Sequence, residues 1–212
     1  MSDRLWQRLG AACGIVYVVL LIGGGSFEGN TVGIAFFVVI LAFLFFLFFL
    51  GNLWSALRRA EGGSGWLSAT AFGAGLMSVT IKVASAAPVL AARYRAGDGL
   101  DLQLARTLED INDVSFYLSF FPLAVLLGAF AIVAIRSGAL PKWLGWIAAA
   151  LGLAFIVGGM SGSADLHSEW AGLPMILFTL WVIATSVVLI RRAGAPRPAE
   201  KETPVEQAAP IG

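Results

Sequence analysis

Six long apolar segments constrain the fold of this chain more than any other feature of its sequence. They cover residues 9–26, 31–54, 66–90, 114–135, 143–160 and 170–190. A helix needs about 20 mostly apolar residues to cross the roughly 30 Å hydrocarbon core of a bilayer. Only 13% of the 212 residues are charged, whereas soluble domains carry about 25%. We therefore predict an all-α, polytopic bundle of six transmembrane helices within residues 1–192.

The two ends of the chain are less constrained than the spans between them. The first span follows the basic start MSDRLWQR and ends in three consecutive glycines, Gly23, Gly24 and Gly25. This pattern also fits a signal peptide, whose cleavage would leave five spans in the same orientation. Residues 193–212 are rich in Pro, Ala and Glu. They carry too little apolar surface to fold, so we predict a disordered cytoplasmic tail.

The positions of the basic residues predict how the spans are oriented. Alternate connections and both ends of the chain carry most of them, namely Arg4, Arg8, Arg58, Arg59, Arg136, Lys142, Arg191, Arg192, Arg197 and Lys201. The same boundary holds five tryptophans, Trp6, Trp54, Trp66, Trp143 and Trp146. Cytoplasmic segments are enriched in Lys and Arg, and tryptophans gather at membrane interfaces. We expect a multi-pass protein of the inner (cytoplasmic) membrane with both termini inside.

The third span carries a lysine, Lys82, roughly 16 residues after its start at Trp66. At 1.5 Å per residue this is about 24 Å along the helix, in the outer part of the hydrocarbon core. Small and polar residues share one face of this span at three- and four-residue spacing: Ala71, Gly75, Ser78, Lys82 and Ser85. Small residues let another helix approach closely, so we expect this face to lie against the bundle.

The fourth span supplies the acidic partners that we expect for Lys82. Asp110 and Asp113 lie at its outer start, together with the polar residues Asn112 and Ser115. Consecutive helices tend to be neighbours, so we predict an ion pair between Lys82 and Asp113, with Asp110 as the reserve partner. The pair is either structural or part of a functional site, because ionisable residues within spans are functional candidates by default.

The last outer connection adds His167 and Glu169 as candidates for the rim of a polar pocket. One histidine and one cysteine in the whole chain exclude a multi-histidine metal site and an internal disulfide. We predict no metal, no cofactor and no catalytic residue. A net charge of +1 gives no reason to expect nucleic-acid binding.

Small residues and prolines predict packing in the later spans. Gly145, Gly152 and Gly159 are spaced by seven in the fifth span, as are Gly172, Thr179 and Ser186 in the sixth. We expect these two spans to pack closely on each other. Pro122 and Pro174 should kink the fourth and sixth spans.

The stretch RSGALPKWLGWIAAALGL, residues 136–153, resembles a recurrent junction in small bacterial six-pass membrane proteins of uncharacterised function. The resemblance covers most of the six-span core. It implies fold and location, and no catalytic residue can be carried over from it.

These features favour a non-enzymatic protein that binds a small molecule or lipid headgroup in an outward-facing pocket. The pocket would be centred on Lys82 and Asp113, with Ser78 on its wall. An accessory role beside another membrane protein fits equally. The alternatives are a small proton-coupled transporter and an intramembrane enzyme that uses His167 and an acid.

Overall fold

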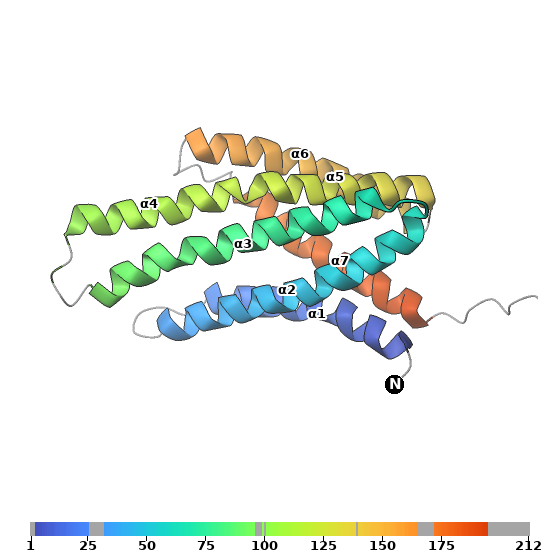
Figure 1. The fold of residues 1–212 in the computed structure, drawn as a ribbon, viewed down its shortest axis with the longest axis horizontal. Coiled ribbons are helices and arrows are strands. Elements are labelled where there is room, and N and C mark those ends of the chain that lie inside the picture. Colours follow the sequence, from blue (N-terminus) through green and yellow to red (C-terminus); the bar gives the residue numbers. More distant parts are fainter. Residues whose placement is uncertain are drawn as a thin grey trace, which may run out of the picture.

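The computed structural model describes residues 3–25, 32–95, 99, 101–138, 140–164 and 172–194. In these residues it has helices and no strands (Figure 1). The helices are α1 (Asp3–Gly25), α2 (Val32–Glu61), α3 (Trp66–Arg95), α4 (Leu102–Leu118), α5 (Phe120–Ser137), α6 (Lys142–Ala164) and α7 (Leu173–Gly194). Only Ser119 separates α4 from α5, so the two form one continuous candidate span. The described helices thus give 6 candidate membrane spans, and the predicted six-span all-α fold is confirmed.

Most helices extend beyond the apolar segments that predicted them. The fourth span was expected from residue 114, but α4 begins at Leu102. With α3 it extends past the other helices at one end of the bundle (Figure 1). Hydropathy marks the part of a helix that faces lipid, whereas backbone hydrogen bonding continues beyond it. At the other end of the chain α7 continues to Gly194, so the disordered tail predicted for residues 193–212 is wrong at its first two residues. Residues 195–212 lie outside the described residues.

A continuous line of aromatic rings joins the helices in the core. Tyr17 of α1 lies 4.8 Å from Phe46 of α2, measured between ring centroids. Phe46 is 6.1 Å from Phe178 of α7, which is 5.7 Å from Phe155 of α6. Phe155 lies 4.9 Å from Phe120 of α5. Tilted and edge-to-face pairs at such distances stabilise a core beyond their buried area.

The glycine face of α6 packs closely, as predicted, but not against the helix that we expected. A Cβ on Gly152 would lie 3.3 Å from the carbonyl oxygen of Ala124 in α5. Gly145 and Gly159 also face the fourth span. On α7, Ser186 lies against Gly14 of α1. The spacing of small residues identified the close-packing faces, but it could not choose their partners.

The two prolines differ in effect. The helix is interrupted at Ser119, three residues before Pro122, where we predicted a kink. The kink predicted at Pro174 is wrong, because α7 begins at Leu173. A proline in the first turn replaces an N–H that has no partner within the helix.

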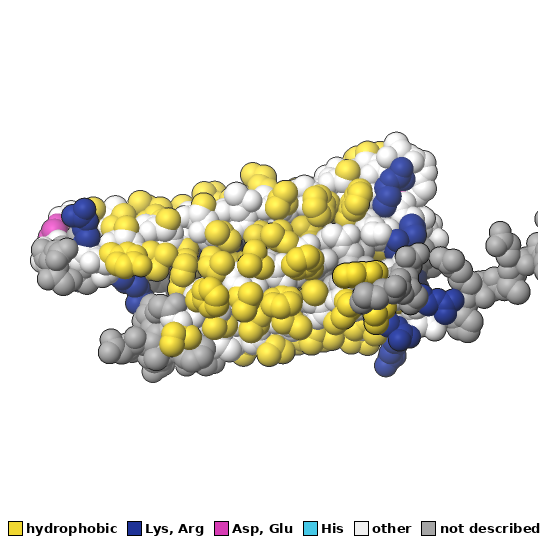
Figure 2. Space-filling model, turned by 60° about the horizontal axis from the view of Figure 1, so that its bottom comes forward, with side chains coloured by type: hydrophobic (Ala, Val, Ile, Leu, Met, Phe, Trp, Pro, Cys, Tyr) yellow, Lys and Arg dark blue, Asp and Glu magenta, His cyan; other side chains and the backbone are white. Residues whose placement is uncertain are grey.

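The ends of the helices define two different ends of the bundle. We call the end where α1 begins and α7 finishes the basic end. It carries Arg4, Arg8, Arg58, Arg59, Arg136, Lys142, Arg191 and Arg192 (Figure 2). The five interface tryptophans are at this end and are exposed, from 41% at Trp54 to 64% at Trp146. Figure 2 shows a broad hydrophobic band between this end and the opposite one.

Candidate functional site

Lys82 lies on the face of α3 that turns toward the bundle, as its spacing predicted. Ala71, Ser78 and Ser85 on that face are at most 5% exposed. The Lys82 ammonium lies 4.4 Å from the centroid of the Phe116 ring on α4. A cation over an aromatic face at this distance is attracted by the ring quadrupole. The aromatic ring is a partner that the sequence analysis did not foresee.

Hydrogen bonds around Lys82 tie α3 to the fourth span. Ser78 Oγ donates to the carbonyl oxygen of Ser119 at 3.1 Å. Ser85 Oγ lies 3.0 Å from the Lys82 carbonyl oxygen and 3.2 Å from Asn112 Oδ1, so its single proton serves both acceptors. The expected juxtaposition of the two polar stripes is therefore present, and Asn112 is part of it.

The ion pair predicted between Lys82 and Asp113 is not formed within the described residues. Asp113 is exposed, and its Oδ1 accepts a hydrogen bond from Asn112 Nδ2 at 3.2 Å. Its charge still acts on the Lys82 ammonium. Asn112 and Phe116 are four residues apart and share the α3-facing side of α4, whereas Asp113 is turned about 100° away from Asn112.

The other predicted members of this site contribute little to it. Asp110 is exposed. Ser115 Oγ donates within its own helix, to the Ile111 carbonyl oxygen at 2.7 Å. His167 and Glu169 lie outside the described residues, so the rim expected from them has no described geometry.

The cavity beside Lys82 is small. It has a volume of about 20 Å³ and lies among Ser78, Lys82, Ser119 and the rings of Tyr17 and Phe178. A cavity needs about 10–15 Å³ to hold one water molecule. This space therefore suits a single water rather than a small molecule.

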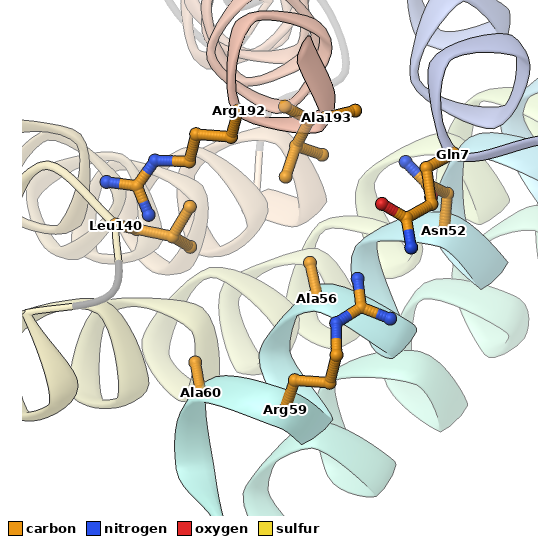
Figure 3. Close-up of a pocket in the computed structure, with 9 residues that line it drawn as sticks. Gln7, Asn52, Ala56, Arg59, Ala60, Leu140, Arg192 and Ala193 are labelled. Atoms are coloured by element: carbon orange, nitrogen blue, oxygen red, sulfur yellow. The ribbon is translucent and has the colours of Figure 1, made fainter. Parts of the chain in front are cut away.

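A larger cavity lies at the basic end, which sequence reasoning did not identify as a site. Its volume is about 290 Å³, and its lining comes from α1, α2, α7 and the connection before α6 (Figure 3). The lining residues are Gln7, Asn52, Ala56, Arg59, Ala60, Leu140, Leu189, Arg192 and Ala193. Two arginines and two amides are among them, and no acidic residue is.

Local hydrogen bonds leave the two cavity arginines largely unsatisfied. Arg59 Nη1 donates to Ser55 Oγ at 2.6 Å, and Arg192 makes no hydrogen bond or ion pair with any described residue. The acid nearest to Arg59 in sequence, Glu61, is already engaged. Its carboxylate accepts the backbone N–H groups of Leu67 and Ser68 at 3.0 and 2.8 Å. A guanidinium has five N–H donors in a planar fork, so the described residues leave most of the donors of Arg59 and Arg192 without an acceptor.

A periodic signal could have drawn attention to this cavity. Asn52, Ser55 and Arg59 follow one another at three- and four-residue spacing near the end of α2, which places them on one side of that helix. In the sequence analysis Arg59 and Arg192 served only as indicators of topology. Both arginines line the cavity because α2 and α7 lie on either side of it, and no local sequence pattern contains that information.

The described part of the chain has the architecture of a polytopic helical membrane protein with an arginine-lined cavity at one end. Within it, no three His, Cys, Asp or Glu side chains gather as metal ligands. No known protein family, curated protein or solved structure matches this chain. The resemblance to small six-pass membrane proteins thus stays a prediction.

Proposed function

We propose that this chain is a non-enzymatic, multi-pass protein of a bacterial cytoplasmic membrane that binds an anionic ligand at its basic end. One observation carries the proposal: Arg59 and Arg192 line a single cavity of about 290 Å³ with no acid among its described lining residues. Guanidinium groups recognise phosphate and carboxylate through paired hydrogen bonds. The volume is close to the lower limit of small-molecule sites, about 300 Å³.

The basic end is proposed to face the cytoplasm. The support is the gathering of arginines and exposed tryptophans at that end, because cytoplasmic segments are enriched in Lys and Arg. A green fluorescent protein fused after Gly212 should fluoresce, and an alkaline phosphatase fused there should be inactive. An active phosphatase fusion would reverse the orientation.

Ligand binding is favoured over proton-coupled transport by the separation of the two cavities. The basic-end cavity and the cavity beside Lys82 have no lining residue in common. A carrier that titrates Lys82 would need a path connecting the ammonium to that end. We therefore assign Lys82 to the contact between α3 and the fourth span, and the ligand to the basic end.

Native mass spectrometry of gently purified protein tests the binding function. Wild type should retain an anionic adduct, whereas Arg59→Gln and Arg192→Gln should lose most of it. Arg191→Gln is the matched control, since it removes the same charge from the residue next to Arg192 but outside the cavity lining. Equal adducts in all four proteins, or none in wild type, would overturn the proposal.

A further inference from the structure

A second hollow, largely apolar, adjoins the basic-end cavity. It is an open groove of about 590 Å³ along α1 and α2, and its apolar lining includes Leu9, Gly10, Cys13, Phe45, Phe48 and Gly51. The space beside Gly51 is open, since a Cβ on this residue would meet no atom within 4 Å. A larger side chain at this position would fill part of the groove. The groove lies within two candidate membrane spans, so in a bilayer it faces acyl chains.

Three polar side chains join this groove to the cavity. Gln7 and Asn52 line both hollows. Ser55 lines the groove and accepts the hydrogen bond from Arg59, which lines the cavity. These polar side chains therefore lie at the boundary between the apolar groove and the arginine-lined cavity. A ligand that extends across this boundary contacts both.

The length of the groove corresponds to one membrane leaflet. On α2 its lining runs from Phe45 to Ser55, a distance of about 15 Å at 1.5 Å per residue. The hydrocarbon core is about 30 Å thick, so one leaflet contributes about 15 Å. Ser55 is at the basic end of this stretch, and Phe45 is toward the middle of the membrane.

We infer that the ligand is an anionic glycerophospholipid, with its phosphate in the cavity that Arg59 and Arg192 line and one acyl chain in the groove along α1 and α2. This inference rests on the proposed function and adds the chemical class of the ligand. A choline or ethanolamine headgroup would bring a cation to a cavity whose described lining residues include arginines and no acid. A glycerol headgroup would instead offer hydroxyls to the amides of Gln7 and Asn52.

Binding measurements on the full chain in detergent micelles separate a lipid from a free phosphate compound. The probes are dioleoyl phosphatidylglycerol, dioleoyl phosphatidylcholine and sn-glycerol 3-phosphate, which carries no acyl chain. Phosphatidylglycerol should bind about tenfold more tightly than phosphatidylcholine. Arg59→Gln should weaken the binding of phosphatidylglycerol by about tenfold, as the loss of a charged hydrogen bond to the phosphate implies. Arg191→Gln should leave the affinity for phosphatidylglycerol unchanged.

Filling the groove tests the position of the acyl chain. Gly51→Leu should weaken phosphatidylglycerol binding by about tenfold, because it displaces methylene groups from the groove, and should leave glycerol 3-phosphate binding unchanged. Gly73→Leu is the matched control, since a Cβ on Gly73 would also meet no atom within 4 Å, but this glycine lies on α3 outside the groove. Phosphatidylglycerol should also slow maleimide labelling of Cys13, the single cysteine of the chain, which lines the groove.

The outcomes distinguish failure of the inference from failure of the proposed function. If glycerol 3-phosphate binds in an Arg59-dependent way while Gly51→Leu and Cys13 labelling show no acyl-chain effect, the lipid inference fails and the anion site stands. If no probe binds in a way that depends on Arg59 and Arg192, both proposals fail.

Discussion

Replacing Gly75 with alanine should destabilise the bundle, whereas the same change at Gly73, two residues earlier in α3, should not. Gly75 is buried where α3 meets α2 and α5. A Cβ there would lie 2.7 Å from Leu126 Cδ1 and 2.8 Å from both Cδ atoms of Leu50. Each leucine is only 1% exposed, so a Cβ on Gly75 would force both side chains to shift within the core of the bundle.

The magnitude follows from comparing the two positions. Overpacking a close-packed core costs about 1–3 kcal/mol. Alanine also gains up to about 1 kcal/mol of helix propensity over glycine, and this gain is common to both substitutions. Because a Cβ on Gly73 would meet nothing within 4 Å, the difference in unfolding free energy between the two variants isolates the steric cost. We expect Gly75→Ala to be less stable than Gly73→Ala by about 1–3 kcal/mol.

Unfolding by SDS in mixed micelles, followed by far-ultraviolet circular dichroism, provides the comparison. Both variants are measured beside wild type at the same total detergent concentration, and reversibility is checked by diluting the SDS. If the two variants have the same unfolding free energy, or if Gly75→Ala is the more stable, then the contact of α3 with Leu50 and Leu126 is not close-packed as described.

Two further predictions concern polar contacts and use the same unfolding assay. Lys82→Met and Phe116→Leu should show a coupling of about 0.5–2 kcal/mol in a double-mutant cycle. Lys82→Met with Asp113→Asn should couple less, because that pair makes no direct contact; a larger coupling to Asp113 would restore the predicted ion pair. Glu61→Ala should cost about 1–2 kcal/mol, since two backbone N–H groups in the first turn of α3 lose their acceptor. Glu61→Gln, which keeps one acceptor, should cost about half as much, and equal losses in the two variants would mean that the charge matters more than the hydrogen bonds.

The sequence predicted most of the architecture because membrane insertion imposes local rules. A span needs a long apolar run wherever it occurs, so the number and order of the spans follow from composition along the chain. The buried face of α3 was also predictable. Close helix contact requires small residues at helical spacing, and Ala71, Gly75 and Ser78 are indeed buried.

The choice of partners was not predictable from such local rules. The glycine face of α6 predicts a close helix contact, but the contact could form with either the preceding or the following span. In the structure this face packs on the fourth span. A sequence identifies charged residues directly, so it predicts a carboxylate as the partner of Lys82. The rotation of α4 instead brings Phe116 to the ammonium and turns Asp113 toward the exposed side. A difference of one residue in register decides between these outcomes.

The two polar regions differ in what a ligand could gain from them. A protein group contributes to affinity only if its hydrogen-bonding capacity is not already used before the ligand arrives. Around Lys82, the neighbouring serines bond to the fourth span or to the α3 backbone, the ammonium lies over an aromatic ring, and the remaining space is about 20 Å³. At the basic end, the described residues use few of the donors of Arg59 and Arg192, which lie beside a cavity of about 290 Å³. Lys82 is therefore suited to holding two helices together, and the arginine pair to recognising an anion that comes from outside the chain.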